Sequence, residues 1–184
     1  MFSRRRRPQP WRTRSSAVVY NQRILVIEDL VSTPSNGEFV YPYVKSAHDA
    51  IATLTMTDDG QVVLARAYCH PMRKILYTLL TGSMLDGEVP SQAARRVLAD
   101  AAGLLAHQLT PLGRMAPFPD TVAGTIHLFL ARKLAPAPDQ RDTPEPGEVV
   151  LMDAIEALQR TLRGEFADGA LQLALLFAAQ QQLF

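Results

Sequence analysis

The sequence predicts a mixed α/β fold, an α+β or α/β sandwich in which helices pack on a mixed sheet. Strand patterns fill the first half of the chain, a helix pattern lies mid-chain, and two helix patterns with capping residues follow later. The 184 residues, 47% of them apolar and 20% charged, are enough for one domain with a full core. This composition is typical of soluble globular proteins and argues against a disordered, collagen-like or coiled-coil chain.

The first half of the chain is predicted to consist of strands. β-branched residues and leucines are interrupted by the turn signals Asn21-Gln22, Asn36-Gly37 and Asp58-Asp59-Gly60. Between these signals the residues alternate or run apolar, as they do in strands of a half-buried sheet. The expected strands cover residues 17–20, 23–31, 38–45, 50–57, 61–68 and 75–80.

The second half combines helices and strands. Pro90 suits the first turn of a helix over Ser91–Ala102, and Gly103 suits the position after its end. Asp153 with Glu156 forms a capping box, and Asp168 can cap a last apolar helix. The remaining expected elements are strands over 105–115 and 125–134, a proline-rich loop over 135–147, and helices from 153 to 163 and from 168 towards 183.

Charge is distributed unevenly along the chain. The first fourteen residues hold six arginines and no acid, and the rest holds 13 basic and 18 acidic residues. We expect residues 1–16 to be a flexible, solvated arm rather than a nucleic-acid or membrane-binding segment, because no aromatic ladder or basic helix follows. The single cysteine, Cys69, excludes an intramolecular disulfide, and the absence of a secretory or membrane-spanning pattern favours the cytoplasm.

The stretch Thr81–Leu104 reads TGSMLDGEVPSQAARRVLADAAGL and resembles the Nudix box. That pattern is glycine, five residues, glutamate, seven residues, then arginine-glutamate, an apolar residue, one residue, two glutamates, one residue, glycine and an apolar residue. Gly82, Glu88 and Arg96 match at the right spacing, and Leu98, Gly103 and Leu104 complete the match. The departures fall on the acids, because Val97, Asp100 and Ala101 stand where the family has glutamates.

The resemblance covers roughly residues 17–180 and looks like the ADP-ribose pyrophosphatase branch of the Nudix hydrolases. It implies an α/β/α sandwich with a mixed sheet, preceded by antiparallel N-terminal strands within one domain over 17–184. It also implies a nucleotide-sugar substrate, Mg²⁺ or Mn²⁺ if the chain is active, and a homodimer formed through residues 17–45. The site residues it implies are Glu88, Arg96, Asp100, Glu145 and Glu148 as catalytic, Arg66 and Gly82 as substrate-binding, and Asp100 as the metal candidate.

The substitutions in the box bear directly on catalysis. Positions 97, 100 and 101 share one helix face, which the family layout turns towards a solvent-filled cleft. In the family three carboxylates on this face hold Mg²⁺, which needs oxygen ligands, whereas Val97 and Ala101 offer none. We expect no tight Mg²⁺ site on this helix and a structural ion pair between Glu88 and Arg96.

Two functions remain open from the sequence. The first is an enzyme that hydrolyses a nucleoside diphosphate linked to a sugar, with catalysis weak or lost. The second is a non-catalytic Nudix-fold protein that binds a nucleotide or has a structural role. Release of AMP from ADP-ribose distinguishes the two.

Overall fold

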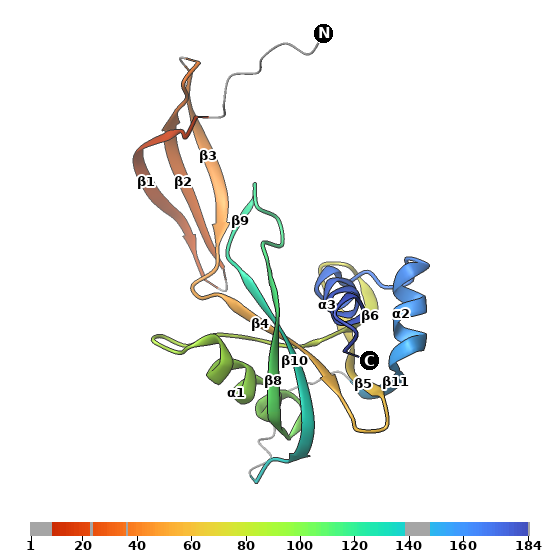
Figure 1. Ribbon diagram of the computed structural model, residues 1–184. Coiled ribbons are helices and arrows are strands. Elements are labelled where there is room, and N and C mark those ends of the chain that lie inside the picture. Colours follow the sequence, from red (N-terminus) through yellow and green to blue (C-terminus); the bar gives the residue numbers. More distant parts are fainter. Residues whose placement is uncertain (1–8, 23, 36, 139–147, 184) are drawn as a thin grey trace. The chain divides into compact units, whose positions relative to one another are not determined.

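The computed structural model describes residues 9–22, 24–35, 37–138 and 148–183, and the chain forms two compact units (Figure 1). Unit 1 comprises Met1–Ala47 and Phe118–Ala123, and unit 2 comprises His48–Pro117 and Gly124–Phe184. The sequence suggested a different division, an arm over 1–16 and one domain over 17–184. The first strand begins inside that arm, at Arg12, and residues 1–8 lie outside the described residues.

Unit 1 is a four-stranded sheet in the order β1-β2-β3-β9. β1 (Arg12–Asn21), β2 (Leu25–Ser32) and β3 (Glu38–Lys45) form the two antiparallel hairpins that the turn signals predicted. β9 (Val122–Ala123), which the sequence did not predict, pairs parallel to β3. All ten residues of β1 are exposed. This unit therefore has little core of its own.

Unit 2 is built on a seven-stranded sheet whose main path is β11-β5-β4-β10-β8. β6 pairs with β5 and β7 pairs with β4. β4 and β10 run parallel and the other pairs are antiparallel, so the sheet is mixed as predicted. The strands are β4 (Ala50–Met56), β5 (Gln61–Cys69), β6 (Lys74–Thr78), β7 (Leu80–Ser83), β8 (Leu104–Met115), β10 (Ile126–Pro136) and β11 (Glu148–Asp153).

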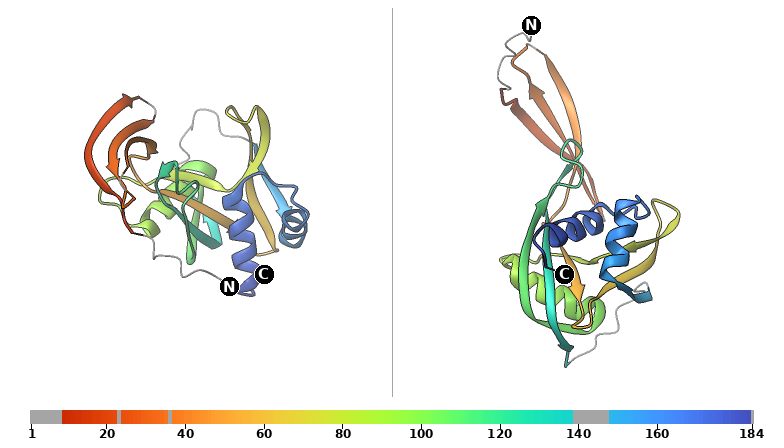
Figure 2. Two further views of the ribbon diagram at one scale, coloured as in Figure 1. Left: turned by 90° about the horizontal axis from the view of Figure 1, so that it is seen from above. Right: turned by 45° about the vertical axis from the view of Figure 1, so that its right-hand side comes forward.

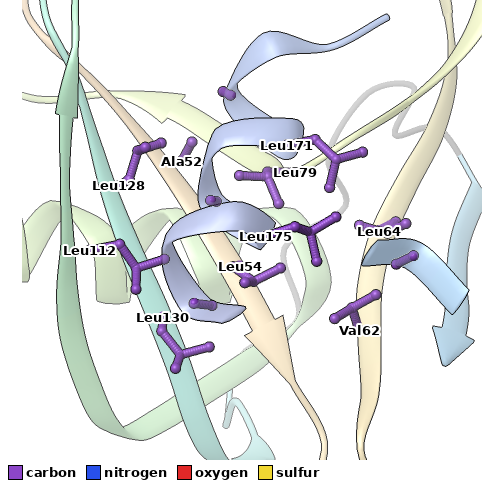
Figure 3. Close-up of a cluster of buried hydrophobic side chains, with 14 of the residues drawn as sticks. Ala52, Leu54, Val62, Leu64, Leu79, Leu112, Leu128, Leu130, Leu171 and Leu175 are labelled. Carbon is purple, nitrogen blue, oxygen red and sulfur yellow. The ribbon is translucent and has the colours of Figure 1, made fainter. Parts of the chain in front are cut away.

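Helices cover both faces of this sheet. α1 (Pro90–Ala102) lies on one side, and α2 (Ala154–Leu162) and α3 (Gly169–Gln180) lie on the other (Figures 1 and 2). Leu128 and Leu130 of β10 pack with Leu175 of α3 (Figure 3), whereas Phe129 packs with the alanines of α1. Because β10 is buried on both faces, unit 2 is the α/β/α sandwich that the resemblance implied.

The helix ends form where the sequence placed them. The backbone N–H of Glu156 donates to Asp153 Oδ1 at 2.9 Å, and that of Leu171 donates to Asp168 Oδ1 at 2.8 Å. Gly103 ends α1 in the left-handed conformation, with φ of 63°. The sequence did not predict β11, and it merged β6 and β7 into one strand. The part of the proline-rich loop over 139–147 lies outside the described residues, as does Glu145.

Among the helices in the described part of the chain, none is both long and apolar enough to cross a membrane.

Candidate functional site

The loop between β7 and α1 is held by a two-pronged ion pair. Arg96 Nε donates to Glu88 Oε1 at 2.9 Å, and Arg96 Nη2 donates to Glu88 Oε2 at 2.8 Å. The same Nη2 reaches the carbonyl oxygen of Ser83 at 2.8 Å, and the N–H of Leu85 donates to Glu88 Oε2 at 2.9 Å. A planar guanidinium matches a carboxylate in this geometry. The pair therefore joins the end of β7, the loop and the helix.

The charges of this cluster are mutually stabilised. The hydrogen bonds from Arg96 lower the pKa of Glu88, and the hydrogen bond to Glu88 raises the pKa of Arg96. Asp100 Oδ2 lies 3.5 Å from Arg96 Nη1, one helical turn further along. The structure thus brings together three residues that the sequence placed in the site, Glu88, Arg96 and Asp100. Both carboxylates face a guanidinium.

We expect Arg96→Ala to lower the melting temperature by several degrees at neutral pH, because it leaves Glu88 without its main partner. The pKa of Glu88 in the folded protein lies below its ordinary value of 4.5, so the pair stabilises the fold above pH 4.5. That contribution disappears as the pH falls through the lowered pKa. The gap in melting temperature between wild type and variant should therefore narrow in acid. Equal melting temperatures at pH 7 would contradict this role.

Val97 is a core residue. Its side chain is 3% exposed and packs with Ile51, Phe129 and two alanines of α1. The opposing strand comes so close that a Cβ atom added at Gly82 would lie 2.7 Å from Val97 Cγ2. The expectation that position 97 faces a solvent-filled cleft is therefore wrong. The strand β7 packs directly onto α1 at this point, and the glycine makes room for the valine.

The positions on this helix face do not fit a resident Mg²⁺ ion. Val97 and Ala101 carry no oxygen, and Ala101 packs against a buried cluster that contains Leu98. Asp100 Oδ2 is directed at Arg96 rather than at further carboxylates. Within the ranges that the structure describes, no group of three or more His, Cys, Asp or Glu side chains could hold a metal ion. A hard cation that needs several oxygen ligands has no complete set here.

Two other predicted site residues lie together elsewhere on the sheet. Arg66 of β5 and Glu148 of β11 are register partners, and Arg66 Nη1 donates to Glu148 Oε2 at 3.0 Å. Both side chains are substantially exposed. Among the described residues, no hydrogen bond or ion pair links these two residues to the Glu88–Arg96–Asp100 cluster. Whether Arg66 binds substrate, or Glu148 takes part in catalysis, stays a prediction.

One polar pair was not found from the sequence. His127 Nε2 lies 3.2 Å from Asp49 Oδ2, and the N–H of Thr125 donates to Asp49 Oδ1 at 3.0 Å. The parallel pairing of β4 and β10 brings these residues together at the start of both strands. No local motif in the sequence indicates the contact between His127 and Asp49, because the two residues are far apart in the chain. The fixed carboxylate can orient the imidazole ring.

The comparisons with known proteins agree with this geometry. The model of the NUDIX domain family matches residues 46–172. The chain is 27% identical over 140 residues to "ADP-ribose pyrophosphatase" of Bacillus subtilis (strain 168), covering 73% of this chain and 75% of that protein. It is 24% identical over 167 residues to "Methanol dehydrogenase activator" of Bacillus methanolicus, covering 89% and 90%.

A solved structure has the same fold. The crystal structure of an ADP compounds hydrolase superposes with a TM-score of 0.85 at 20% sequence identity, covering 97% of both chains.

Proposed function

Because the chain belongs to the NUDIX domain family, we propose that it recognises a nucleoside diphosphate linked to a sugar, of the ADP-ribose type, and hydrolyses it weakly or not at all. The substrate class is supported by a relative named for ADP-ribose and by the match of Gly82, Glu88 and Arg96 to the box. They lie in β7, in the loop after it and in α1, so these parts of the box keep the family pattern.

The packing of Val97 carries the second half of the proposal. Metal-assisted hydrolysis of a diphosphate needs a positive centre that activates water and offsets charge on the leaving oxygen. In this chain the helix face that would hold such a centre is partly core, with Val97 buried against Gly82. The chain keeps the scaffold of the site and has lost most of the oxygen ligands.

Two measurements on the same protein test the proposal. Calorimetric titration with ADP-ribose should show saturable binding, and AMP release with Mg²⁺ or Mn²⁺ should be slow or undetectable. Arg66→Gln should weaken binding several-fold, whereas Lys74→Gln, which removes a charge from the neighbouring strand β6, should leave it unchanged. Rapid AMP release would overturn the loss of catalysis. The absence of binding to ADP-ribose and related nucleotide sugars would overturn the ligand class.

A second function is favoured by one relative. The protein named as an activator of methanol dehydrogenase matches along 89% of this chain. A non-catalytic Nudix protein that acts on another enzyme would need the scaffold and no metal ligands. The test adds the purified chain to methanol dehydrogenase. A higher dehydrogenase rate with no AMP release from ADP-ribose would favour this function over the first.

We also propose that the chain forms a homodimer through the strands of unit 1. Large apolar side chains of this unit are exposed, among them Val18, Val19, Tyr20, Ile24 and Val40. A sheet with so little core gains stability when such residues become buried. Light scattering should give twice the chain mass, and Val18→Asp should reduce it towards the monomer. A monomeric wild type at micromolar concentration would contradict the dimer.

A further inference from the structure

Unit 1 contains a cavity of about 740 Å³ at the beginning of β1. It is lined by the start of β1 and by the turn between β2 and β3, and we call it the arginine cavity. Its polar residues are Gln9, Arg12, Arg14, Ser32, Thr33 and Glu38. Neither the family match, which begins at residue 46, nor the proposed nucleotide-sugar site involves this part of the chain.

The donors of the arginine cavity are largely available. The side chain of Arg12 forms no hydrogen bond or ion pair with any other residue that the structure describes. Arg14 Nε lies 3.5 Å from Glu38 Oε1, and both side chains are more than half exposed. An exposed pair of this kind is weak and competes poorly with a second anion. Guanidinium groups beside the hydroxyl of Ser32 form a donor set suited to phosphate oxygens.

The charge around the cavity favours a chain of phosphates over a single one. Six arginines and no acid occur in the first fourteen residues, and two of these arginines, Arg12 and Arg14, line the cavity. Arg4 to Arg7 lie outside the described residues and form no part of the proposed site. Two guanidinium groups, with Glu38 as the one acidic residue among the described residues that line the cavity, match successive phosphates of a polyanion.

An aromatic cluster lies next to the cavity. Trp11, between the cavity residues Pro10 and Arg12, is 50% exposed. Its ring centroid is 5.3 Å from that of Phe39 and 5.8 Å from that of Tyr41. No aromatic ladder is visible in the sequence after the arm, because these rings come together only through the register of β1, β2 and β3. A half-exposed indole provides a surface on which an unpaired base can stack.

The arginine cavity and the aromatic rings lie on opposite faces of the sheet, beside its free edge. Arg12 pairs in register with Ser32, and Ser32 with Glu38, so these residues share one face. Phe39 is the next residue along β3 and therefore points to the other face. β1 is the outermost strand of this sheet. A flexible single strand of nucleic acid can cross the edge of the sheet and contact both of its faces, whereas a flat membrane surface or a stiff duplex cannot.

We propose that the arginine cavity and Trp11 bind single-stranded nucleic acid. The phosphates contact Arg12 and Arg14, and one unpaired base stacks on the indole. This activity is independent of the nucleotide-sugar site in unit 2.

Trp11 is the chain's single tryptophan, so its fluorescence reports on this site without labelling. Titration with an oligothymidylate of about 20 nucleotides at about 50 mM salt should quench it, and the affinity should fall steeply as salt is added. Arg12→Gln with Arg14→Gln should weaken binding about tenfold and flatten the slope of log K against log salt by roughly 1.4, at about 0.7 for each lost phosphate contact. Trp11→Ala, followed by anisotropy of a labelled oligonucleotide, should weaken binding about tenfold.

Matched variants separate this site from general charge effects. Arg73→Gln with Lys74→Gln removes the same charge from unit 2 and should leave both affinity and slope unchanged. Arg12→Lys with Arg14→Lys should keep the slope. The proposal is overturned if wild type does not bind at low salt, or if the two glutamine pairs weaken binding equally. Stronger binding to a duplex of the same length, or Arg12-dependent binding to phosphatidylglycerol vesicles without binding to the oligonucleotide, would overturn it as well.

Discussion

Val97→Glu should unfold the protein or leave it insoluble. The side chain is 3% exposed and surrounded by Ile51, Phe129 and alanines, none of which can pair with a carboxylate. A buried, uncompensated charge costs about 3–5 kcal/mol. The whole stability of a domain is about 5–15 kcal/mol, so this one change can remove most of it. Urea unfolding of the soluble fraction, or the loss of that fraction, measures the effect.

Asp100→Glu is the matched control on the same helix. The Asp100 side chain is 34% exposed, so a longer carboxylate reaches solvent and should change stability by no more than about 0.5 kcal/mol. Restoring all three family carboxylates with Val97→Glu, Asp100→Glu and Ala101→Glu should fail for the same reason as the single change at 97. A stable Val97→Glu protein that binds Mg²⁺ would show that this helix face is open, contrary to its packing.

The fold was predictable where local chemistry decides it. The capping carboxylates Asp153 and Asp168 and the left-handed Gly103 act within a few residues of themselves, so their roles can be read from the sequence. Turn signals and alternation likewise located most strands. β11 was missed because it directly follows the proline-rich loop expected over 135–147 and has only six residues. β9 has two residues, too few to show a period.

The candidate site was predictable in its spacing and not in its burial. The eight-residue interval from Glu88 to Arg96 places the two partners correctly, and their hydrogen bonds form. Helical spacing places positions 97, 100 and 101 on one face of α1. It does not specify what packs against that face, because this depends on the pairing of β7 with β4. The contact between Arg66 and Glu148 depends on distant strand pairing in the same way.

Gly82→Ala should destabilise the protein, and Val97→Ala should relieve much of that cost. The new methyl group would lie 2.7 Å from Val97 Cγ2, so β7 or the valine must shift, at about 1–3 kcal/mol. Val97→Ala alone leaves a small cavity and costs about 1–3 kcal/mol. In the double variant the added methyl occupies space that the valine vacated, so its cost should fall short of the sum by about 0.5–3 kcal/mol.

Gly169→Ala is the control, because nothing lies within 4 Å of its added Cβ, and it should be neutral or slightly stabilising. Strictly additive costs at 82 and 97 would mean that the two residues do not touch. The packing of Val97 on Gly82 would then not explain why this helix face does not hold a metal ion.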